Sequence, residues 1–263
     1  MAEQDLIFAL DIGTRTVVGI VGSYDGEKFK INACEVAEHR ERAMYDGQIH
    51  DIELVAKAVR SVKARLEKSL GVELKRGYIA AAGRTLKTCK VFVERETDPT
   101  IELDSELINS LEIEAIQQAQ RQVEEASREE ELSFFCVGYA VVNYYLNGAI
   151  IGNPEGHKAS RTGLEVLATF LPRAVVDCLY AVMLRSGLEV ASLTLEPIAA
   201  MNVSIQSNLK LLNLALVDIG AGTSDIALTK NGTVFAFAMA TVAGDEITEK
   251  IAETLLLDFD EAE

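Results

Sequence analysis

The feature that most constrains the fold is a pattern that occurs twice in the chain. An apolar strand ends in an acid, a glycine-containing turn follows, and a second apolar strand returns. Residues 214–230 read LALVDIGAGTSDIALTK, and residues 7–22 read IFALDIGTRTVVGIVG, so that Asp218 aligns with Asp11. A single Asp-Gly turn is common between strands. Two copies so far apart predict two similar half-domains whose hairpins grip one ligand.

The residue types in the second hairpin suit a phosphate group and its metal ion. The turn that contains Gly220 and Gly222 leaves backbone N–H groups uncovered by side chains, so several can point at one anion. Thr223 and Ser224 add hydroxyl donors, and Asp218 at the end of the strand can hold a hydrated cation. Gly244, before a predicted helix, marks a second candidate anion site at the N-terminus of that helix.

Composition limits the classes of function. The chain has 263 residues, 49% of them hydrophobic and 25% charged, which predicts a globular protein with a substantial core. A formal net charge of −16 argues against nucleic acid as a partner, although a nucleotide can still be bound through backbone N–H groups and a metal ion. The four scattered cysteines are expected to be core thiols rather than disulfides or zinc ligands. No histidine is assigned a catalytic role.

One segment approaches the length of a membrane span. Residues 133–154 carry no charge. Their asparagines and glycines would be costly in lipid, and Asn147-Gly148 is a strong hairpin signal. We therefore expect two buried strands there.

Hydrophobic periodicity and breaker residues predict alternating strands and helices. Asp51 can cap a helix that Gly71 ends. Strands are expected at 27–34, 77–82, 85–94, 134–151, 164–170, 189–195 and 234–242, and helices at 51–70, 104–125 (one helix or two), 173–186, 198–207 and from 246. A strand, helix, strand arrangement within 84–171 predicts a compact α+β insertion.

Five segments carry a family resemblance: LDIGTRTVVGIVG, VDIGAGTSDIAL, LEPIAA, GQIHDIELVAKAV and AGDEITEKIAETL. Together they resemble the actin-like ATPase superfamily, most closely the bacterial cell-division family FtsA, over nearly the whole chain. The resemblance implies an α/β fold built from a duplicated ribonuclease-H-like sheet, with ATP between two domains. The first domain would comprise 1–83 and 172–209, a small α+β domain would be inserted at 84–171, and the second would begin at 210–263.

The resemblance also implies roles for the residues that match family motifs. Asp11 would hold a hydrated Mg²⁺, and Asp218 would act on the metal from the opposite side and take part in catalysis. Glu196 would orient the attacking water, although it can also be read as an acid that caps the following helix. The remaining positions would bind the phosphates: Gly13, Thr14, Arg15, Gly220, Ala221, Gly222, Thr223 and Gly244.

Two departures from the family pattern stand out. Ala221 replaces a glycine that is usual in the family, which removes some backbone freedom. The remainder of the second domain, the adenosine-binding glycine motif and the membrane-targeting helix have no counterpart here. We therefore expect an incomplete second domain with the phosphate side of a site, and at most slow Mg²⁺-dependent ATPase activity, which this chain is not expected to show alone.

The function implied is a scaffold that binds ATP and Mg²⁺, associates with itself and recruits the tubulin-like FtsZ ring. It would be cytoplasmic, at the inner face of the cell membrane, which it would reach only through a C-terminal segment absent here. Two alternatives stay open. One is a pilus-assembly actin homologue like PilM, and the other is a sugar kinase or polyphosphate phosphatase of the same superfold.

Overall fold

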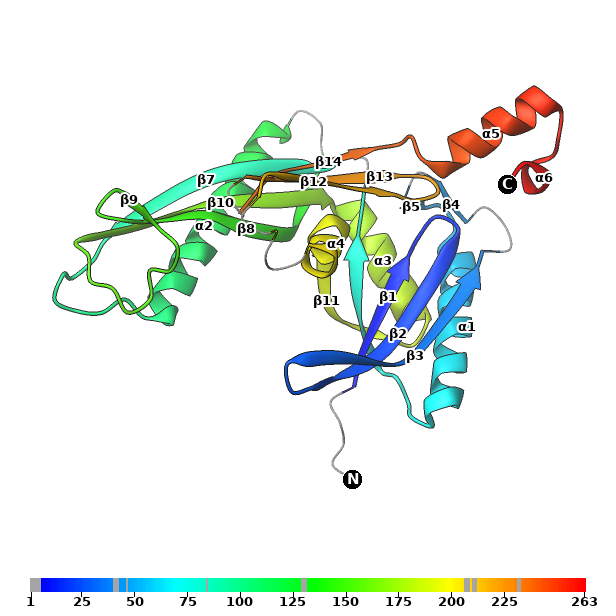
Figure 1. Cartoon of the computed structure of the whole chain (residues 1–263), viewed down its shortest axis with the longest axis horizontal. Helices are drawn as coiled ribbons and strands as arrows, with labels where there is room; N and C mark the ends of the chain where they lie inside the picture. Colours follow the sequence, from blue (N-terminus) through cyan, green and yellow to red (C-terminus); the bar gives the residue numbers. More distant parts are fainter. Residues whose placement is uncertain are drawn as a thin grey trace.

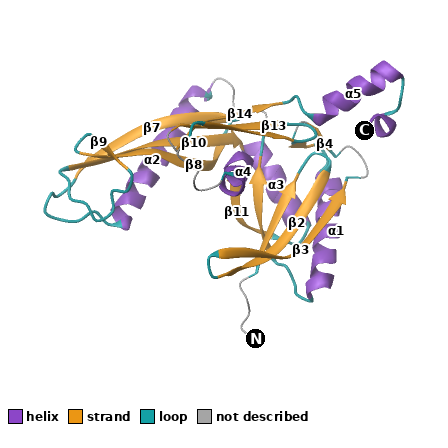
Figure 2. Ribbon diagram, in the orientation of Figure 1, coloured by secondary structure: helices purple, strands orange, loops and turns teal. Residues whose placement is uncertain are grey.

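The structure, a computed structural model, describes residues 6–39, 43–45, 47–83, 85–128, 132–205, 209, 212–230 and 233–263. The described strands form sheets of five, four and three strands and one small two-stranded hairpin. Figure 1 shows the four-stranded sheet at one end of the molecule and the five-stranded sheet below the three-stranded one. Helices lie beside the two larger sheets (Figure 2).

The five-stranded sheet has the order β11-β6-β1-β2-β3. Its members are β1 (Ile7–Ile12), β2 (Thr16–Asp25), β3 (Lys28–Glu38), β6 (Arg76–Ala81) and β11 (Glu189–Leu195). The first three form an antiparallel meander, whereas β6 pairs parallel to both β1 and β11. The predicted hairpin at 7–22 and its extension by a third strand are therefore confirmed.

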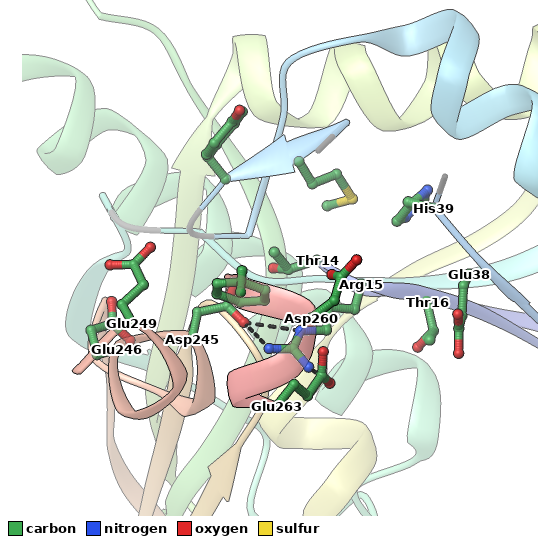
Figure 3. Close-up of a pocket in the computed structure, with 13 residues that line it drawn as sticks. Thr14, Arg15, Thr16, Glu38, His39, Asp245, Glu246, Glu249, Asp260 and Glu263 are labelled. Atoms are coloured by element: carbon green, nitrogen blue, oxygen red, sulfur yellow. Dashed lines mark hydrogen bonds and ion pairs between the residues drawn. The ribbon is translucent and has the colours of Figure 1, made fainter. Parts of the chain in front are cut away.

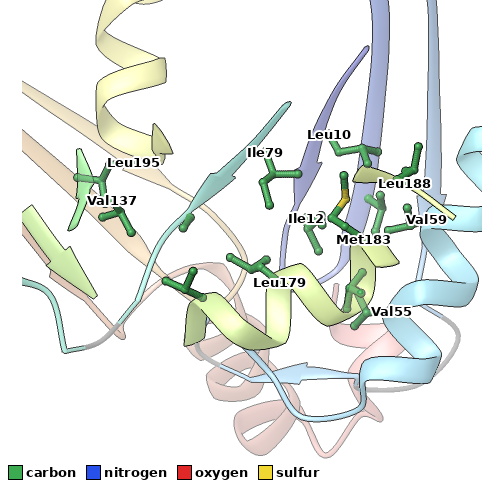
Figure 4. Close-up of a cluster of buried hydrophobic side chains, with 14 of the residues drawn as sticks. Leu10, Ile12, Val55, Val59, Ile79, Val137, Leu179, Met183, Leu188 and Leu195 are labelled. Carbon is green, nitrogen blue, oxygen red and sulfur yellow. The ribbon is translucent and has the colours of Figure 1, made fainter. Parts of the chain in front are cut away.

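Two helices pack on this sheet and build the main core. In α1 (Ile52–Leu70), the Asp51 side chain accepts hydrogen bonds from two backbone N–H groups, and Gly71 ends the helix in the left-handed conformation. This confirms both predicted caps. The helix α3 (Arg173–Arg185) lies against α1. Figure 4 shows side chains of β1, α1 and α3 meeting in this core, among them Leu10, Ile12, Val55, Val59 and Met183.

The four-stranded sheet has the order β7-β10-β8-β9. Its strands are β7 (Lys87–Glu96), β8 (Phe134–Leu146), β9 (Ala149–Ile151) and β10 (Arg161–Pro172). One continuous helix, α2 (Ser105–Ala126), packs on it and closes a separate hydrophobic cluster. Asn147 and Gly148 both have positive φ angles, as the predicted hairpin turn requires. The segment 133–154 thus contains strands, but they are not buried as expected, because β8 is mostly half-buried and β9 is mostly exposed. The proposed domain boundaries stay a prediction.

The three-stranded sheet lies next to both larger sheets. Its strands are β12 (Leu214–Ile219), β13 (Ser224–Lys230) and β14 (Thr233–Ala240), and the hairpin predicted at 214–230 is confirmed. The helix α4 (Glu196–Ser204) contacts β12 and β13, and β14 contacts β8 and β10. The chain continues into α5 (Gly244–Leu255) and α6 (Phe259–Ala262). The small hairpin consists of β4 (Met44–Tyr45) and β5 (Gln48–Ile49).

Some expectations differ from the structure in detail. The helix expected at 198–207 begins at Glu196, because Pro197 fits the first turn, where no hydrogen-bond donor is needed. The cysteines are free thiols but not core residues, since Cys34 is exposed and the other three are half-buried. No helix among the described residues is long and apolar enough to cross a membrane.

Candidate functional site

Four carboxyl groups converge from four different elements. Asp11 lies near the end of β1, Glu196 begins α4, Asp218 lies near the end of β12, and Asp225 follows the start of β13. The antiparallel register of β12 and β13 places Asp218 directly opposite Asp225. Asp11 and Asp218 remain accessible to solvent, whereas Asp225 is buried. The two hairpins that share one sequence pattern therefore bring their acids to one place.

The carboxyl groups of this carboxylate cluster act on one another electrostatically. Although Asp11 keeps some exposed surface, desolvation of its carboxyl group by the surrounding protein and then the charge of Asp218 raise the pKa of Asp11 above its usual range. Burial, followed by the charges of Asp11, Asp225 and Asp218, raises the pKa of Glu196 to about 8. Burial and Asp218 together raise the pKa of Asp225 to about 6. The cluster carries negative charge that a bound cation would stabilise.

The residues present fit a hydrated magnesium ion. Among the described residues, no ion pair neutralises any of the four carboxyl groups, and Asp225 Oδ1 is buried without a hydrogen-bond partner. In the same part of the chain, no group of three or more acids, histidines or cysteines is arranged to hold a metal ion. Mg²⁺ usually keeps several of its waters, so acids that reach it through water need not form such a group. The assignment of Asp11 and Asp218 to the metal stays a prediction.

The turn of the first hairpin is held by a histidine. Gly13 N–H donates to the Thr16 carbonyl at 2.9 Å, and the backbone N–H of His39 donates to the Arg15 carbonyl at 2.9 Å. The Nε2 atom of the His39 ring lies 3.1 Å from the Gly13 carbonyl oxygen. A carbonyl only accepts, so Nε2 carries the proton, and burial lowers the pKa of His39. His39 therefore fixes both ends of the turn.

The turn of the second hairpin is held from two sides. Gly220 N–H donates to the Thr223 carbonyl at 2.8 Å, which closes the turn. The first N–H groups of α5 then bind this turn: Gly244 N–H donates to the Gly220 carbonyl at 3.0 Å and Asp245 N–H to the Ala221 carbonyl at 2.8 Å. The N–H of Gly244 is thus already used within the protein, and its predicted role in anion binding stays untested.

A cavity of about 660 Å³ lies beside the first turn. Figure 3 shows Arg15 reaching into it toward Asp245. Its lining residues come from the first hairpin, β3, β4, α5 and α6: Thr14, Arg15, Thr16, Glu38, His39, Met44, Tyr45, Asp245, Glu246, Glu249, Phe259, Asp260 and Glu263. Its volume is in the range of ligand pockets. The lining does not include Asp11, Asp218 or Glu196. The cavity therefore lies beside the first hairpin but does not contain the carboxylate cluster.

Comparison with known proteins shows what this chain is similar to. No protein-family model matches the sequence. It is 24% identical over 253 residues to the cell division protein FtsA of Pseudomonas aeruginosa, covering 95% of this chain and 57% of that protein. It is 24% identical over 266 residues to FtsA of Bacillus subtilis, covering 100% of this chain and 58% of that protein. This chain is a distant homologue of the FtsA proteins. It spans less than three-fifths of the length of these two FtsA relatives.

Solved structures confirm the actin-like α/β fold that the FtsA resemblance implies. A chain of a PilM–PilN type IV pilus biogenesis complex matches with a TM-score of 0.68 at 14% identity, covering 97% of this chain and 67% of that one. The ethanolamine utilization protein EutJ of Carboxydothermus hydrogenoformans matches with a TM-score of 0.54 at 19% identity, covering 98% and 59%. At these identities the likeness establishes the fold.

Within this FtsA-like fold, the residues singled out from sequence fall into three groups. Three of the acids, Asp11, Glu196 and Asp218, meet in the carboxylate cluster. Thr14 and Arg15 line the adjoining cavity. The others form the two turns or their support: Gly13, Gly220, Ala221, Gly222, Thr223 and Gly244. Their roles toward a ligand remain predictions.

Sequence reasoning missed three residues of this region. Asp225 could have been found from the hairpin register, because a tight turn after Asp218 puts an acid of the return strand opposite it. His39 and Asp245 carried no comparable signal. His39 contacts Gly13, and Asp245 contacts Arg15, and in both pairs the partners lie far apart in the sequence.

Proposed function

We propose that this chain forms the phosphate-binding part of an FtsA-like scaffold that binds ATP with Mg²⁺. The observation that carries the proposal is the convergence of Asp11 and Asp218 from two hairpins of one pattern, with their charges unneutralised by any described side chain. Distant homology to FtsA proteins over nearly the full chain supports it.

Each part of the site has a defined task in this proposal. Asp11 and Asp218 would hold hydrated Mg²⁺ from the two sides. Asp225, whose Oδ1 atom has no hydrogen-bond partner, would add negative charge beside Asp218. The magnesium ion, when bound, would neutralise phosphate charge. The first turn, with Thr14, and the second turn, with Thr223, would supply N–H and hydroxyl donors to the phosphates.

Glu196 is the candidate residue for hydrolysis. Its carboxyl group lies beside the cluster at the start of α4, with a pKa raised to about 8 mainly by burial. A raised pKa suits a group that accepts a proton from water near neutral pH. Because a cation at Asp11 and Asp218 would favour the ionised form, Glu196 would become a base only in the loaded site. Turnover would be slow, with nucleotide acting as an assembly switch.

The cellular role proposed is cell division. The protein would associate with itself, recruit a tubulin-like FtsZ partner and lie at the inner face of the membrane. The unit formed by α2 and the four-stranded sheet is the candidate contact region, because its own hydrophobic cluster lets it present a stable surface. No role in nucleic-acid binding is proposed, since the net charge is −16.

Titration of this chain with ATP, with and without Mg²⁺, tests the first step. Isothermal titration calorimetry should show binding that requires Mg²⁺ and that competes with ADP. Saturable binding of neither nucleotide at millimolar concentration would overturn the proposal for this chain. Electron microscopy with ATP tests self-association, and a strict monomer at high concentration would count against the scaffold role.

A pilus-assembly role is the second candidate, because a chain of a PilM–PilN complex shares the fold with a TM-score of 0.68. Copurification from the native cell separates the two: an FtsZ-type partner supports the cell-division role, and a PilN-type partner supports the pilus role. A sugar kinase or polyphosphate phosphatase would instead transfer phosphate rapidly to a small acceptor or hydrolyse long polyphosphate. Both reactions can be assayed directly.

A further inference from the structure

The Arg15 side chain, which the proposed function assigns to phosphate binding, is instead bound to the carboxylate of Asp245. Its Nε and Nη2 atoms donate to Asp245 Oδ1 at 3.0 Å and 2.6 Å. Its guanidinium also pairs with Glu263 and lies over the Phe259 ring, 5.3 Å from the ring centroid. Arg15 belongs to the turn of the first hairpin, whereas Asp245 lies in the first turn of α5. The contact thus joins the two halves of the candidate site.

The side chains that line the cavity are mostly acidic, and Arg15 stands among them. Its lining contains six carboxylates: Glu38, Asp245, Glu246, Glu249, Asp260 and Glu263. Among the described residues that line it, Arg15 is the only arginine or lysine. Besides the Mg²⁺ that would accompany it, a polyphosphate that enters such an acidic space meets one arginine of the lining, Arg15.

Asp245 is firmly placed to compete. Its backbone N–H donates to the Ala221 carbonyl at 2.8 Å, so the helix start is anchored to the second turn. Its side chain is 19% exposed and that of Arg15 is 30% exposed, so the pair is partly shielded from solvent. Charge-assisted hydrogen bonds in such a setting are stronger than those of a fully exposed pair.

We propose that Asp245 sets the polyphosphate affinity of this site by holding the Arg15 guanidinium, which an entering polyphosphate must take over. The inference rests on the proposed nucleotide-binding function and adds a residue that opposes binding. Transfer of Arg15 from Asp245 to phosphate removes an ion pair between the first hairpin and α5. Ligand binding is thereby coupled to the position of α5 relative to the first hairpin.

The test compares binding of Mg·ATP and of magnesium pyrophosphate by this chain and its variants. Pyrophosphate has no base or ribose, so it isolates the phosphate contacts. Asp245→Asn should tighten binding of both ligands about three- to tenfold, because one of the two carboxylates that compete for Arg15 loses its charge while side-chain size is kept and the pair with Glu263 remains. Arg15→Gln should weaken binding. In the Arg15→Gln background, Asp245→Asn should change affinity by less than about twofold.

Asp260→Asn is the matched control, because it removes one negative charge from the same cavity lining. It should tighten binding less than Asp245→Asn does, since it acts only through the screened field. A gain in affinity is informative because damage to folding would lower affinity instead.

The outcomes separate the two proposals. Weaker binding by Asp245→Asn, or equal tightening with and without Arg15, or equal tightening by Asp260→Asn, overturns the inference while the proposed function stands. Absence of polyphosphate binding by the wild type and every variant overturns the proposed function and the inference with it.

Discussion

Asp225 lies directly opposite Asp218 on the β12–β13 ladder, and burial together with this neighbouring charge raises the pKa of Asp225 to about 6. Asp218 also raises the pKa of Asp11, which comes from the other hairpin. One carboxylate of the second hairpin thus acts on acids from both hairpins. This relationship is what the proposed metal site depends on, and several measurable consequences follow from it and from the contacts around it.

Neutralising either central acid should weaken Mg²⁺-dependent ATP binding strongly. We expect Asp11→Asn and Asp218→Asn each to weaken Mg·ATP binding at least about tenfold, because each removes a charge that would face the hydrated ion. Calorimetric titration measures this. Asp25→Asn, at the exposed end of β2, is the control and should bind like the wild type. Normal affinity in both cluster variants would refute the metal assignment.

Glu196→Gln should separate binding from hydrolysis. The amide keeps the size of the side chain but cannot accept a proton from water, so we expect ATP turnover to fall about tenfold or more. The dissociation constant for Mg·ATP should stay within about threefold. Phosphate release and calorimetry provide the two readouts, with the exposed Glu189→Gln as control. Loss of binding equal to that of the Asp11 and Asp218 variants would show that the roles are wrongly assigned.

Without divalent cations, stability should fall as pH rises. The folded chain holds the Glu196 proton up to about pH 8 and the Asp225 proton up to about pH 6, above their ordinary values of 4.5 and 3.8. Between the ordinary and the raised pKa of each group, the folded state therefore binds more protons than the unfolded state. The stabilisation that is present below about pH 4 is lost as pH rises toward 8.

Glu196→Gln should accordingly flatten that pH dependence. At pH 8 the variant should exceed the wild type in free energy of unfolding by about 1 to 3 kcal/mol, and the difference should fade near pH 5. Urea unfolding in the presence of EDTA at both pH values measures it. Addition of Mg²⁺ should restore part of the wild-type stability at pH 8. A constant difference at both pH values would contradict the assigned titration.

Removal of the His39 ring donor should loosen the first turn. His39→Phe keeps a ring but loses the bond to the Gly13 carbonyl, so Mg·ATP affinity should fall about three- to tenfold. His39→Gln keeps an N–H donor and should recover part of the loss. His157→Phe, in an exposed loop, serves as control. Equal affinities for the Phe and Gln variants would mean that the hydrogen bond does not position the turn.

Gly19→Ala tests the packing of β2 against α1. A Cβ atom at Gly19 would collide with the side chains of Val62 and Leu66, so the free energy of unfolding should fall by about 1 to 3 kcal/mol. Gly152→Ala introduces the same methyl group into open space and should change stability by less than about 0.5 kcal/mol. Urea unfolding compares the two, and similar values would show that β2 and α1 are not closely packed at Gly19.

Local features of the fold could be predicted because their causes lie within a few residues. The Asp51 cap, the left-handed Gly71 and the Asn147-Gly148 turn each follow from the conformational preferences of those residue types. Element boundaries were less certain, as the start of α4 at Glu196 shows, because Glu and Pro are tolerated on either side of a helix start.

The candidate site could be predicted in part. Asp11 and Asp218 stood out because one pattern occurs twice, and their convergence was expected from that repetition. Asp225 and His39 were not found, since an acid in a strand and a histidine before a loop are ordinary in sequence. Burial and neighbouring charges give them their properties, and both arise only when distant elements pack.

By itself, the sequence determined the two Asp-Ile-Gly hairpins, the strands and helices between them and the cap residues, because hydrogen bonding and hydrophobic periodicity over short distances suffice for these. Only the tertiary structure decided that Arg15 is held by Asp245, that His39 fixes the Gly13 turn and that burial among the other acids raises the pKa of Glu196. Such contacts depend on how separate elements pack, and long-range Coulomb energy and desolvation cannot be assigned before those distances exist.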